Sequence, residues 1–323
     1  MERLLLTLGI IVASLAAGYV FRRRVDSGWA WCNTDDLARL RKRMQVLAIF
    51  FFMPVSAMFS LWGLPTPDAR LLALPLLGVT AYVLGGALSI PVSRVLGLNR
   101  QQTGSFFCCA TFTNIGAVGS LVCVLFLGEA TIAMAALYRL CEEMFYYGIA
   151  FPVAQWYGQG HEGQRFTLRG LKADPLLCVV LLALGLGIAL NVSALPRPEI
   201  ARIGATVFML LSTTFLLVTI GLGLRFSRMG GYVCPGLAVS IIKFVCVPLL
   251  IVTLAWLLGF GEVDSGLPLR AVAILSCMPV AMNALVPPSL YNLDLDLANA
   301  CWIYSTLGLV VVLPVLLVVL PLL

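Results

Sequence analysis

Charged residues are scarce in this chain of 323 residues, because Asp, Glu, Lys and Arg together make up only 11% of it. A typical soluble domain is about a quarter charged and roughly half apolar, whereas 61% of this chain is apolar. Its mean hydropathy is +1.00. This balance excludes a disordered chain, a coiled coil and an ordinary soluble globule. It predicts an all-α polytopic membrane protein whose main partner is the lipid bilayer.

Histidine is nearly absent, since His161 is the only one, and the ten cysteines include no CxxC pair. Zinc sites and disulfide frameworks need clusters of such residues. We therefore expect no metal and no cofactor. An intramembrane hydrolase would also need paired catalytic Asp residues, a Ser with a base or a His-rich site. The expected spans contain none of these, so the sequence predicts that the protein is not an enzyme.

Apolar segments long enough to cross a bilayer recur ten times. A spanning helix needs roughly 20 mostly apolar residues, because its backbone must satisfy its own hydrogen bonds. The connections between the segments are too short to hold a soluble domain. The expected spans are residues 4–21, 44–62, 70–93, 103–127, 130–156, 176–190, 200–224, 232–258, 268–290 and 297–320.

Basic residues outside the spans are unevenly distributed between the two sides. One set of alternate connections carries fourteen of them, and the other set, with the N-terminal segment, carries five. By the positive-inside rule, both termini then lie outside, in a bacterial inner (plasma) membrane. The net charge of +6 belongs to this topology and to contact with anionic lipid, so we expect no nucleic-acid partner. The larger set is Arg22, Arg23, Arg24, Arg39, Arg41, Lys42, Arg43, Arg94, Arg100, Arg165, Arg169, Lys172, Arg225 and Arg228.

The longest connection divides the ten spans into five and five. Residues 1–157 form a first five-helix repeat, residues 158–175 a cytoplasmic connecting loop, and residues 176–323 a second repeat. An odd number of spans in each half makes the second half enter the membrane from the opposite side. The sequence therefore predicts two inverted repeats, as in many secondary transporters.

The fourth span of each half carries an Asn beside residues that weaken helices. Asn114 is followed by Gly116 and Gly119, and Asn283 lies among three prolines that include Pro279. Interrupted spans at matching positions are the best sequence indication of a transporter's binding site. The structural alternative is that small residues and prolines serve close helix packing. The match between the two halves favours binding.

Four charged residues lie within spans, where an ionised group is costly. Arg139 precedes Glu142 and Glu143 by three and four residues, so one cation reaches two carboxylates on a continuous helix. The surplus carboxylate is a candidate for proton coupling, and the structural alternative is an ion pair that joins two helices. Lys243 lies nearer the inner face and either extends its charge to the membrane surface or attracts an anionic substrate.

These residues resemble the auxin efflux carrier family, whose bacterial members are often described as malonate or malate permeases. The ten-span plan agrees over essentially the whole chain. The departure is Ser120, because many members carry a Pro just after the second Gly. The matching positions are Lys243 with Pro248, Met278-Pro279 with Asn283, Tyr291 with Asp294 and Ala298, Ser305-Thr306-Leu307 to Pro314 and, in the first half, Asn114-Ile115-Gly116-Ala117-Val118-Gly119.

The resemblance implies a fold like that of bile acid and sodium-proton carriers, in which the fourth and ninth helices are broken and cross at mid-membrane. It also implies that one helix bundle moves against the other to carry organic anions. Carried over by motif, Asn114, Gly116, Gly119, Pro279 and Asn283 line the site.

The sequence thus predicts a secondary carrier for a small mono- or dicarboxylate. Asn114 and Asn283 would donate hydrogen bonds, Ser120 would add a hydroxyl group, and Lys243 would add positive charge. The alternatives are a membrane-embedded sensor that binds the same ligand without moving it, and a carrier like the bile acid and sodium symporters. A homodimer also stays open, since a lipid-facing surface and a dimer interface look alike at this level.

Overall fold

The computed structural model describes residues 2–27, 34–63, 69–158, 175–193, 195–222 and 229–323. Over these residues it is helical, and strand pairing is confined to one isolated bridge. The expected loop at 158–175 lies almost entirely outside the described residues, as do its basic residues and the two at 225 and 228. The fold is that of a polytopic membrane protein.

The chain forms two compact units, and each draws on both halves of the sequence. The first unit comprises Met1–Pro67, Gly116–Ala136 and Pro175–Arg225, and the second comprises Asp68–Ile115, Leu137–Asp174 and Phe226–Leu323. These units are defined by which residues lie close together, and they do not test whether the two halves of the sequence have the same fold. The inverted repeats at 1–157 and 176–323 therefore remain a prediction.

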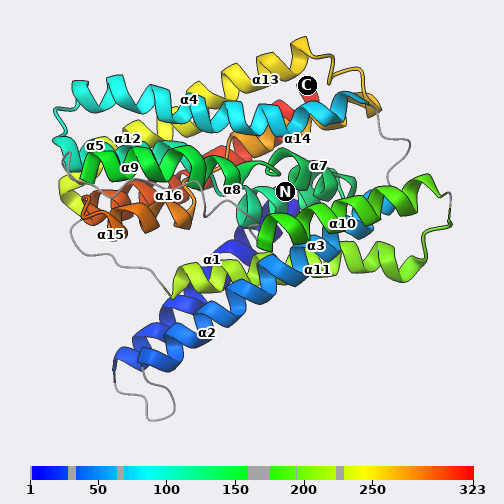
Figure 1. Cartoon of the computed structure of the whole chain (residues 1–323), viewed down its shortest axis with the longest axis horizontal. Coiled ribbons are helices and arrows are strands. Elements are labelled where there is room, and N and C mark those ends of the chain that lie inside the picture. Colours follow the sequence, from blue (N-terminus) through cyan, green and yellow to red (C-terminus); the bar gives the residue numbers. More distant parts are fainter. Residues whose placement is uncertain (1, 28–33, 64–68, 159–174, 194, 223–228) are drawn as a thin grey trace. The chain divides into compact units, whose positions relative to one another are not determined.

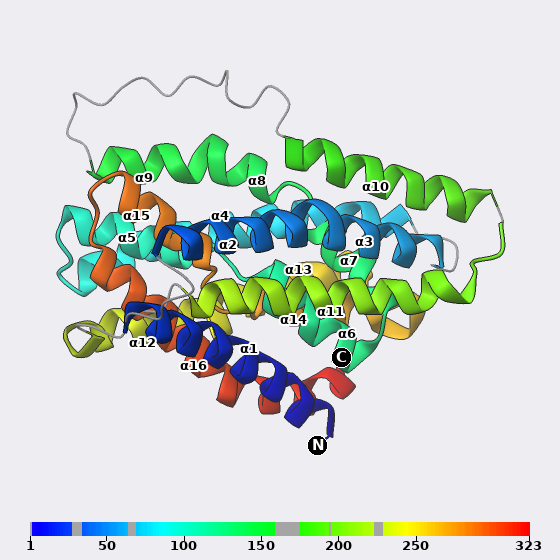
Figure 2. The same cartoon turned by 90° about the horizontal axis from the view of Figure 1, so that it is seen from below.

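In the first unit, α11 packs along α1 and α3, and α10 packs on α3. The two views show α11 beside α3 (Figures 1 and 2). The contact between α1 and α11 depends on Gly18 and Gly221, because a Cβ on either would overlap a carbonyl oxygen of the facing helix. The helices are α1 (Glu2–Asp26), α2 (Thr34–Leu47), α3 (Met53–Trp62), α6 (Ser120–Leu127), α10 (Pro175–Val192) and α11 (Glu199–Gly221), with π-helical segments at Ala48–Phe52 and Ile115–Gly119.

In the second unit, α4 packs against α5 and α13, α5 against α9, and α16 against α12. Its helices are α4 (Leu74–Val95), α5 (Arg100–Thr111), α8 (Glu142–Phe145), α9 (Phe151–Gly158), α12 (Val233–Ile241), α13 (Val247–Leu257), α14 (Leu267–Ser276), α15 (Val286–Leu290) and α16 (Leu295–Val319). Two π-helical segments, Tyr146–Ala150 and Ile242–Cys246, interrupt the longer helical runs. α7 (Ala130–Tyr138) links the two units along the chain.

The close packing of α4 on α5 predicts that Gly85→Ala destabilises the protein. A Cβ at Gly85 would overlap the carbonyl oxygen of Ala110, whereas nothing lies within 4 Å of a Cβ at Gly148. Overpacking costs about 1–3 kcal/mol, so thermal unfolding in detergent should begin several degrees lower for Gly85→Ala. The matched control Gly148→Ala should unfold at or above the wild-type temperature. The reverse order would show that α4 and α5 are not in backbone contact.

Asp294 joins three elements at one end of the second unit. Its carboxylate accepts the Leu297 N–H at 2.9 Å and so caps the start of α16. It also accepts from the Tyr232 hydroxyl at 2.8 Å and the Gln102 amide at 3.3 Å. Ser105 of α5 donates to the carbonyl oxygen of Asp294 at 2.7 Å. The first turns of α5 and α16 are therefore fastened together.

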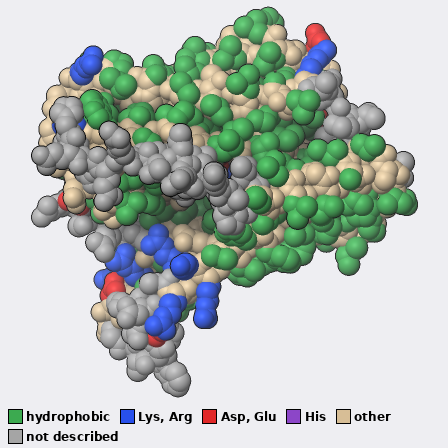
Figure 3. All heavy atoms as spheres, viewed as in Figure 1, with side chains coloured by type: hydrophobic (Ala, Val, Ile, Leu, Met, Phe, Trp, Pro, Cys, Tyr) green, Lys and Arg blue, Asp and Glu red, His purple; other side chains and the backbone are tan. Residues whose placement is uncertain are grey.

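Hydrophobic side chains cover much of the face shown in Figure 3, as expected for a protein in lipid. Lys and Arg side chains gather over the ends of α1 and α2, where the sequence carries the clusters at 22–24 and 39–43. In the described part of the chain, six helices are long and apolar enough to span a membrane: Leu5–Asp26, Arg39–Trp62, Arg70–Val95, Glu199–Gly221, Gly230–Leu257 and Leu295–Leu322. Each matches an expected span, and the full set of ten remains a prediction.

The fifth expected span, residues 130–156, is not the continuous helix that the sequence suggested. α7 ends at Tyr138, three turn residues follow, and α8 begins at Glu142. The break falls at the charged residues, whose side chains pair across it, and apolar periodicity alone does not reveal it. A membrane depth counted along a straight helix therefore does not hold beyond Tyr138.

Candidate functional site

Two interrupted helices of the second unit pair through extended backbone. α5 ends at Thr111, Phe112 adopts φ −76° and ψ 124°, and Thr113 forms an antiparallel bridge with Val280. The Asn114 N–H donates to the Pro279 carbonyl at 2.8 Å, and the Ala281 N–H donates to the Phe112 carbonyl at 3.1 Å. We call residues 112–114 and 278–281 the crossing.

The sequence explains why the chain leaves the helix at the crossing. Pro279 lacks an N–H group and disfavours a helical conformation at Met278 before it, and α14 ends at Ser276. The freed backbone groups cannot bond to lipid, and here the two extended segments satisfy each other. Non-helical backbone of this kind occurs in membranes where it is buried in protein or lines a cavity.

Lys243 lies at the crossing, in the interior of the second unit. The residue is only 2% exposed, so its side chain turns into the protein and does not extend outward, as one sequence interpretation allowed. Its Nζ donates to the Thr113 hydroxyl at 2.5 Å and to the Thr111 carbonyl at 3.3 Å. Both partners are neutral, and within the described chain Lys243 forms no ion pair.

Arg139 and Glu142 form an ion pair that also reaches the crossing. The Arg139 Nε lies 2.7 Å from one Glu142 oxygen, and the Tyr146 hydroxyl donates to the other at 2.9 Å. Glu142 is buried, with 4% of its surface exposed. The Tyr146 oxygen in turn accepts the Thr113 N–H at 3.3 Å. A continuous chain of polar contacts therefore runs from Arg139 through Glu142, Tyr146 and Thr113 to Lys243.

Aromatic rings hold this chain of contacts in place. The Tyr146 ring stacks on Phe112 with centroids 3.9 Å apart, and Tyr82 lies 5.4 Å from Tyr146. In the described structure, the hydroxyl oxygens of Tyr82 and Thr111 are buried without a hydrogen-bond partner. Unsatisfied polar groups in a protein interior need an explanation, and an unseen water or ligand is one.

The structure brings five of the predicted residues together within the second unit. Asn114, Pro279, Lys243, Arg139 and Glu142 all belong to the second unit around the crossing, and Asn114 is 8% exposed. Asn283 lies two residues beyond the crossing, in a 3₁₀ turn, and is exposed. Three further predicted residues, Gly116, Gly119 and Ser120, belong to the first unit. The side chain of Glu143 lies outside the described residues.

Sequence reasoning missed Thr113 and Tyr146. Tyr146 lies four residues after Glu142, a spacing that places two side chains on one helix face, so this contact had a local signal. Thr113 directly precedes Asn114. Its contact with Lys243 has no local signal in the sequence, because 130 residues separate Thr113 from Lys243. Within the described chain, no three His, Cys, Asp or Glu residues are placed to hold a metal ion.

The chain is similar in sequence to a protein that is named as a transporter. The chain is 25% identical, over 253 residues, to a protein named an uncharacterized transporter from the archaeon Methanothermobacter thermautotrophicus. The match covers 77% of this chain and 79% of the relative. No protein-family model matches the chain. Together with the membrane-helical structure, the relative supports a transporter in general.

Proposed function

We propose that the protein is a secondary carrier that moves a small organic anion, a mono- or dicarboxylate such as malate or malonate, by alternating access. The observation that carries this proposal is the buried side chain of Lys243, whose amine is held at the crossing by neutral oxygens. A buried charge without a counter-ion is costly. An anionic ligand would offset that cost.

The balance of charge around the crossing also supports an anion. Of the charged side chains that the structure describes there, Arg139 and Glu142 neutralise each other, so a protonated Lys243 gives the crossing a net positive charge. Asn114 contributes an amide at the same place, and a helical segment begins at Ile115 directly after it. Helix N-termini carry partial positive charge and bind carboxylates in transporters.

The second unit contains both arms of the crossing and Lys243. We propose that this unit carries the bound anion as one body during alternating access. Glu142 is the candidate for proton coupling, because its carboxylate bonds to the hydroxyl that in turn accepts from the crossing. A proton on Glu142 would change the donor and acceptor pattern at Tyr146 and so act on the backbone of Thr113.

Counterflow in proteoliposomes tests the carrier proposal. Vesicles loaded with unlabelled malate or malonate should accumulate the labelled acid transiently, and empty vesicles should not. Binding of the acid without any counterflow would instead support the sensor. Stimulation by a sodium gradient and not by a proton gradient would support a carrier like the bile acid and sodium symporters.

The coupling proposal predicts that Glu142→Gln removes the response to protons. An inward proton gradient should stimulate uptake by the wild type several-fold and leave uptake by Glu142→Gln unchanged, because glutamine carries no exchangeable acidic proton. Tyr146→Phe keeps the ring stacked on Phe112 and removes the hydroxyl, so it should reduce the stimulation while counterflow continues.

The matched control for Tyr146→Phe is Tyr138→Phe. Tyr138 is buried, and in the described structure its hydroxyl has no hydrogen-bond partner, so its loss should leave the response to the gradient intact. If Glu142→Gln and the wild type respond equally to the proton gradient, the Arg139 and Glu142 pair is structural.

A further inference from the structure

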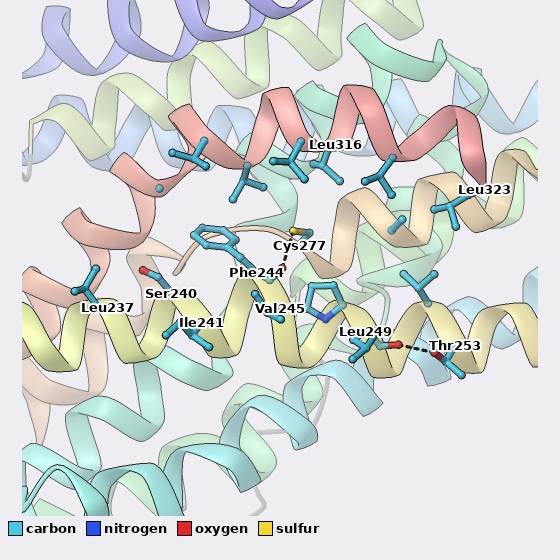
Figure 4. A pocket seen from close by; sticks show the side chains of 18 residues that line it. Leu237, Ser240, Ile241, Phe244, Val245, Leu249, Thr253, Cys277, Leu316 and Leu323 are labelled. Atoms are coloured by element: carbon cyan, nitrogen blue, oxygen red, sulfur yellow. Dashed lines mark hydrogen bonds between the residues drawn. The ribbon is translucent and has the colours of Figure 1, made fainter.

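The second unit has an apolar groove of about 710 Å³ that the crossing does not use. Figure 4 shows it between the α12 to α13 run and α16, with α14 beside it. Along its outer side, Leu237, Ile241, Val245 and Leu249 recur at every fourth residue, and each is more than half exposed. Residues at this spacing share one helix face. That face belongs to the candidate span Gly230–Leu257, so the groove opens toward hydrocarbon.

The few polar groups in the groove already have partners. The hydroxyl of Ser240 donates to the Gly236 carbonyl at 2.8 Å, and that of Thr253 donates to the Leu249 carbonyl at 2.7 Å. The Cys277 thiol donates to the Phe244 carbonyl at 3.6 Å. These contacts use the donors of all three groups, so the groove offers few hydrogen bonds to water. Its volume is in the range of small-molecule sites, and its lining suits an alkyl chain.

A positive charge lies at one end of the groove. Gly266 lies between Arg270 and Leu323, and Leu323 lines the groove. A Cβ at Gly266 would be 3.6 Å from Nη2 of Arg270 and 3.2 Å from the carbonyl oxygen of Leu323. Arg270 also precedes the lining residue Ala273 by three positions on α14, so these two residues share a face of that helix. Its Nη2 donates to the Ser265 carbonyl, and within the described chain its Nε is buried without a partner.

We propose that the groove binds an anionic phospholipid of the bilayer, with one acyl chain along α16 and the phosphate at Arg270. The apolar lining matches an acyl chain in shape and chemistry, and basic residues between membrane helices bind anionic headgroups. The lipid would contact Phe244 and Cys277, which lie next to Lys243 and to the crossing in the chain. The bound chain would therefore support the helices that position the crossing.

Native mass spectrometry of the delipidated full chain tests this proposal without any transport measurement. Phosphatidylglycerol should remain bound at collision energies that remove phosphatidylcholine of the same acyl chains. Arg270→Gln should reduce phosphatidylglycerol retention at least tenfold, and the control Arg94→Gln, on α4, should not. Equal retention of the two lipids by the wild type would overturn the headgroup assignment.

A large side chain placed in the groove tests whether the lipid binds there or elsewhere on the protein. Val312→Trp should abolish retention of either lipid, and the matched control Val310→Trp, on the same helix but outside the groove, should not. Val315→Trp, at an exposed lining position, serves if Val312→Trp does not fold. A filled groove that still retains phosphatidylglycerol overturns the proposal. The proposal is also overturned if the Trp variant converts a dimer to a monomer and leaves lipid binding unchanged. The groove would then be an interface between two copies of the chain.

Discussion

Counterflow of a dicarboxylate is expected to fall at least about 30-fold when Lys243 is replaced by methionine. Loss of one partner from a buried charge pair costs about 2–5 kcal/mol, and 1.4 kcal/mol corresponds to a factor of about ten. Methionine has a similar shape and no charge. The bound anion would therefore lose its cation, while the packing around residue 243, which is almost fully buried, is kept.

The same replacement is expected to leave the free energy of unfolding unchanged or to raise it. Replacing buried charges with apolar residues of similar volume is often neutral or stabilising by about 1–4 kcal/mol. Thermal unfolding and counterflow should be measured on one preparation, with Arg94→Gln, an exposed position in the last turn of α4, as the charge-loss control. Wild-type counterflow by a folded Lys243→Met protein would remove the lysine from the site.

Asn114→Ala and Asn283→Ala are each expected to reduce counterflow by roughly 10- to 150-fold. A hydrogen bond to a charged group contributes about 1.5–3 kcal/mol, and each amide is proposed to donate to the carboxylate. The fold should survive both changes. The pairing at residue 114 uses its backbone N–H, which bonds to the Pro279 carbonyl at 2.8 Å, and Asn283 is exposed.

The control for these two variants is Asn299→Ala, which removes an amide from α16 in the same unit. Its counterflow should match the wild type. Rates near wild type for both Asn114→Ala and Asn283→Ala would move the binding site away from the crossing. Loss of counterflow in only one of the two variants would place the anion beside the segment that carries that Asn.

The interruptions of the fourth and ninth spans were predictable, because their cause is local. Pro279 removes a backbone donor, and the glycines after Asn114 weaken the helix, so sequence alone indicates where each helix stops. That the two stops meet, with Thr113 opposite Val280, is a long-range fact. Sequence reasoning reached it only through the family resemblance.

The surroundings of the charged residues were harder to predict. The expectation that Arg139 reaches both Glu142 and Glu143 assumed a continuous helix, and the turn between α7 and α8 breaks that assumption. The side chain of Lys243 is long enough either to extend to a membrane surface or to turn inward, and only tertiary packing decides between these. Its contact with Thr113 joins positions on separate helices, which hydropathy and spacing do not connect.

The cluster around Asp294 ties the first half of α5 to α16 through Gln102 and Ser105, and the other end of α5 leads into the crossing. From Ser105 to Thr111 the helix extends roughly 9 Å at about 1.5 Å per residue. A tilt of about 10° around Ser105 would then displace Thr111 by roughly 1.5 Å. A displacement of that size is large enough to break the hydrogen bond between the Asn114 N–H and the Pro279 carbonyl.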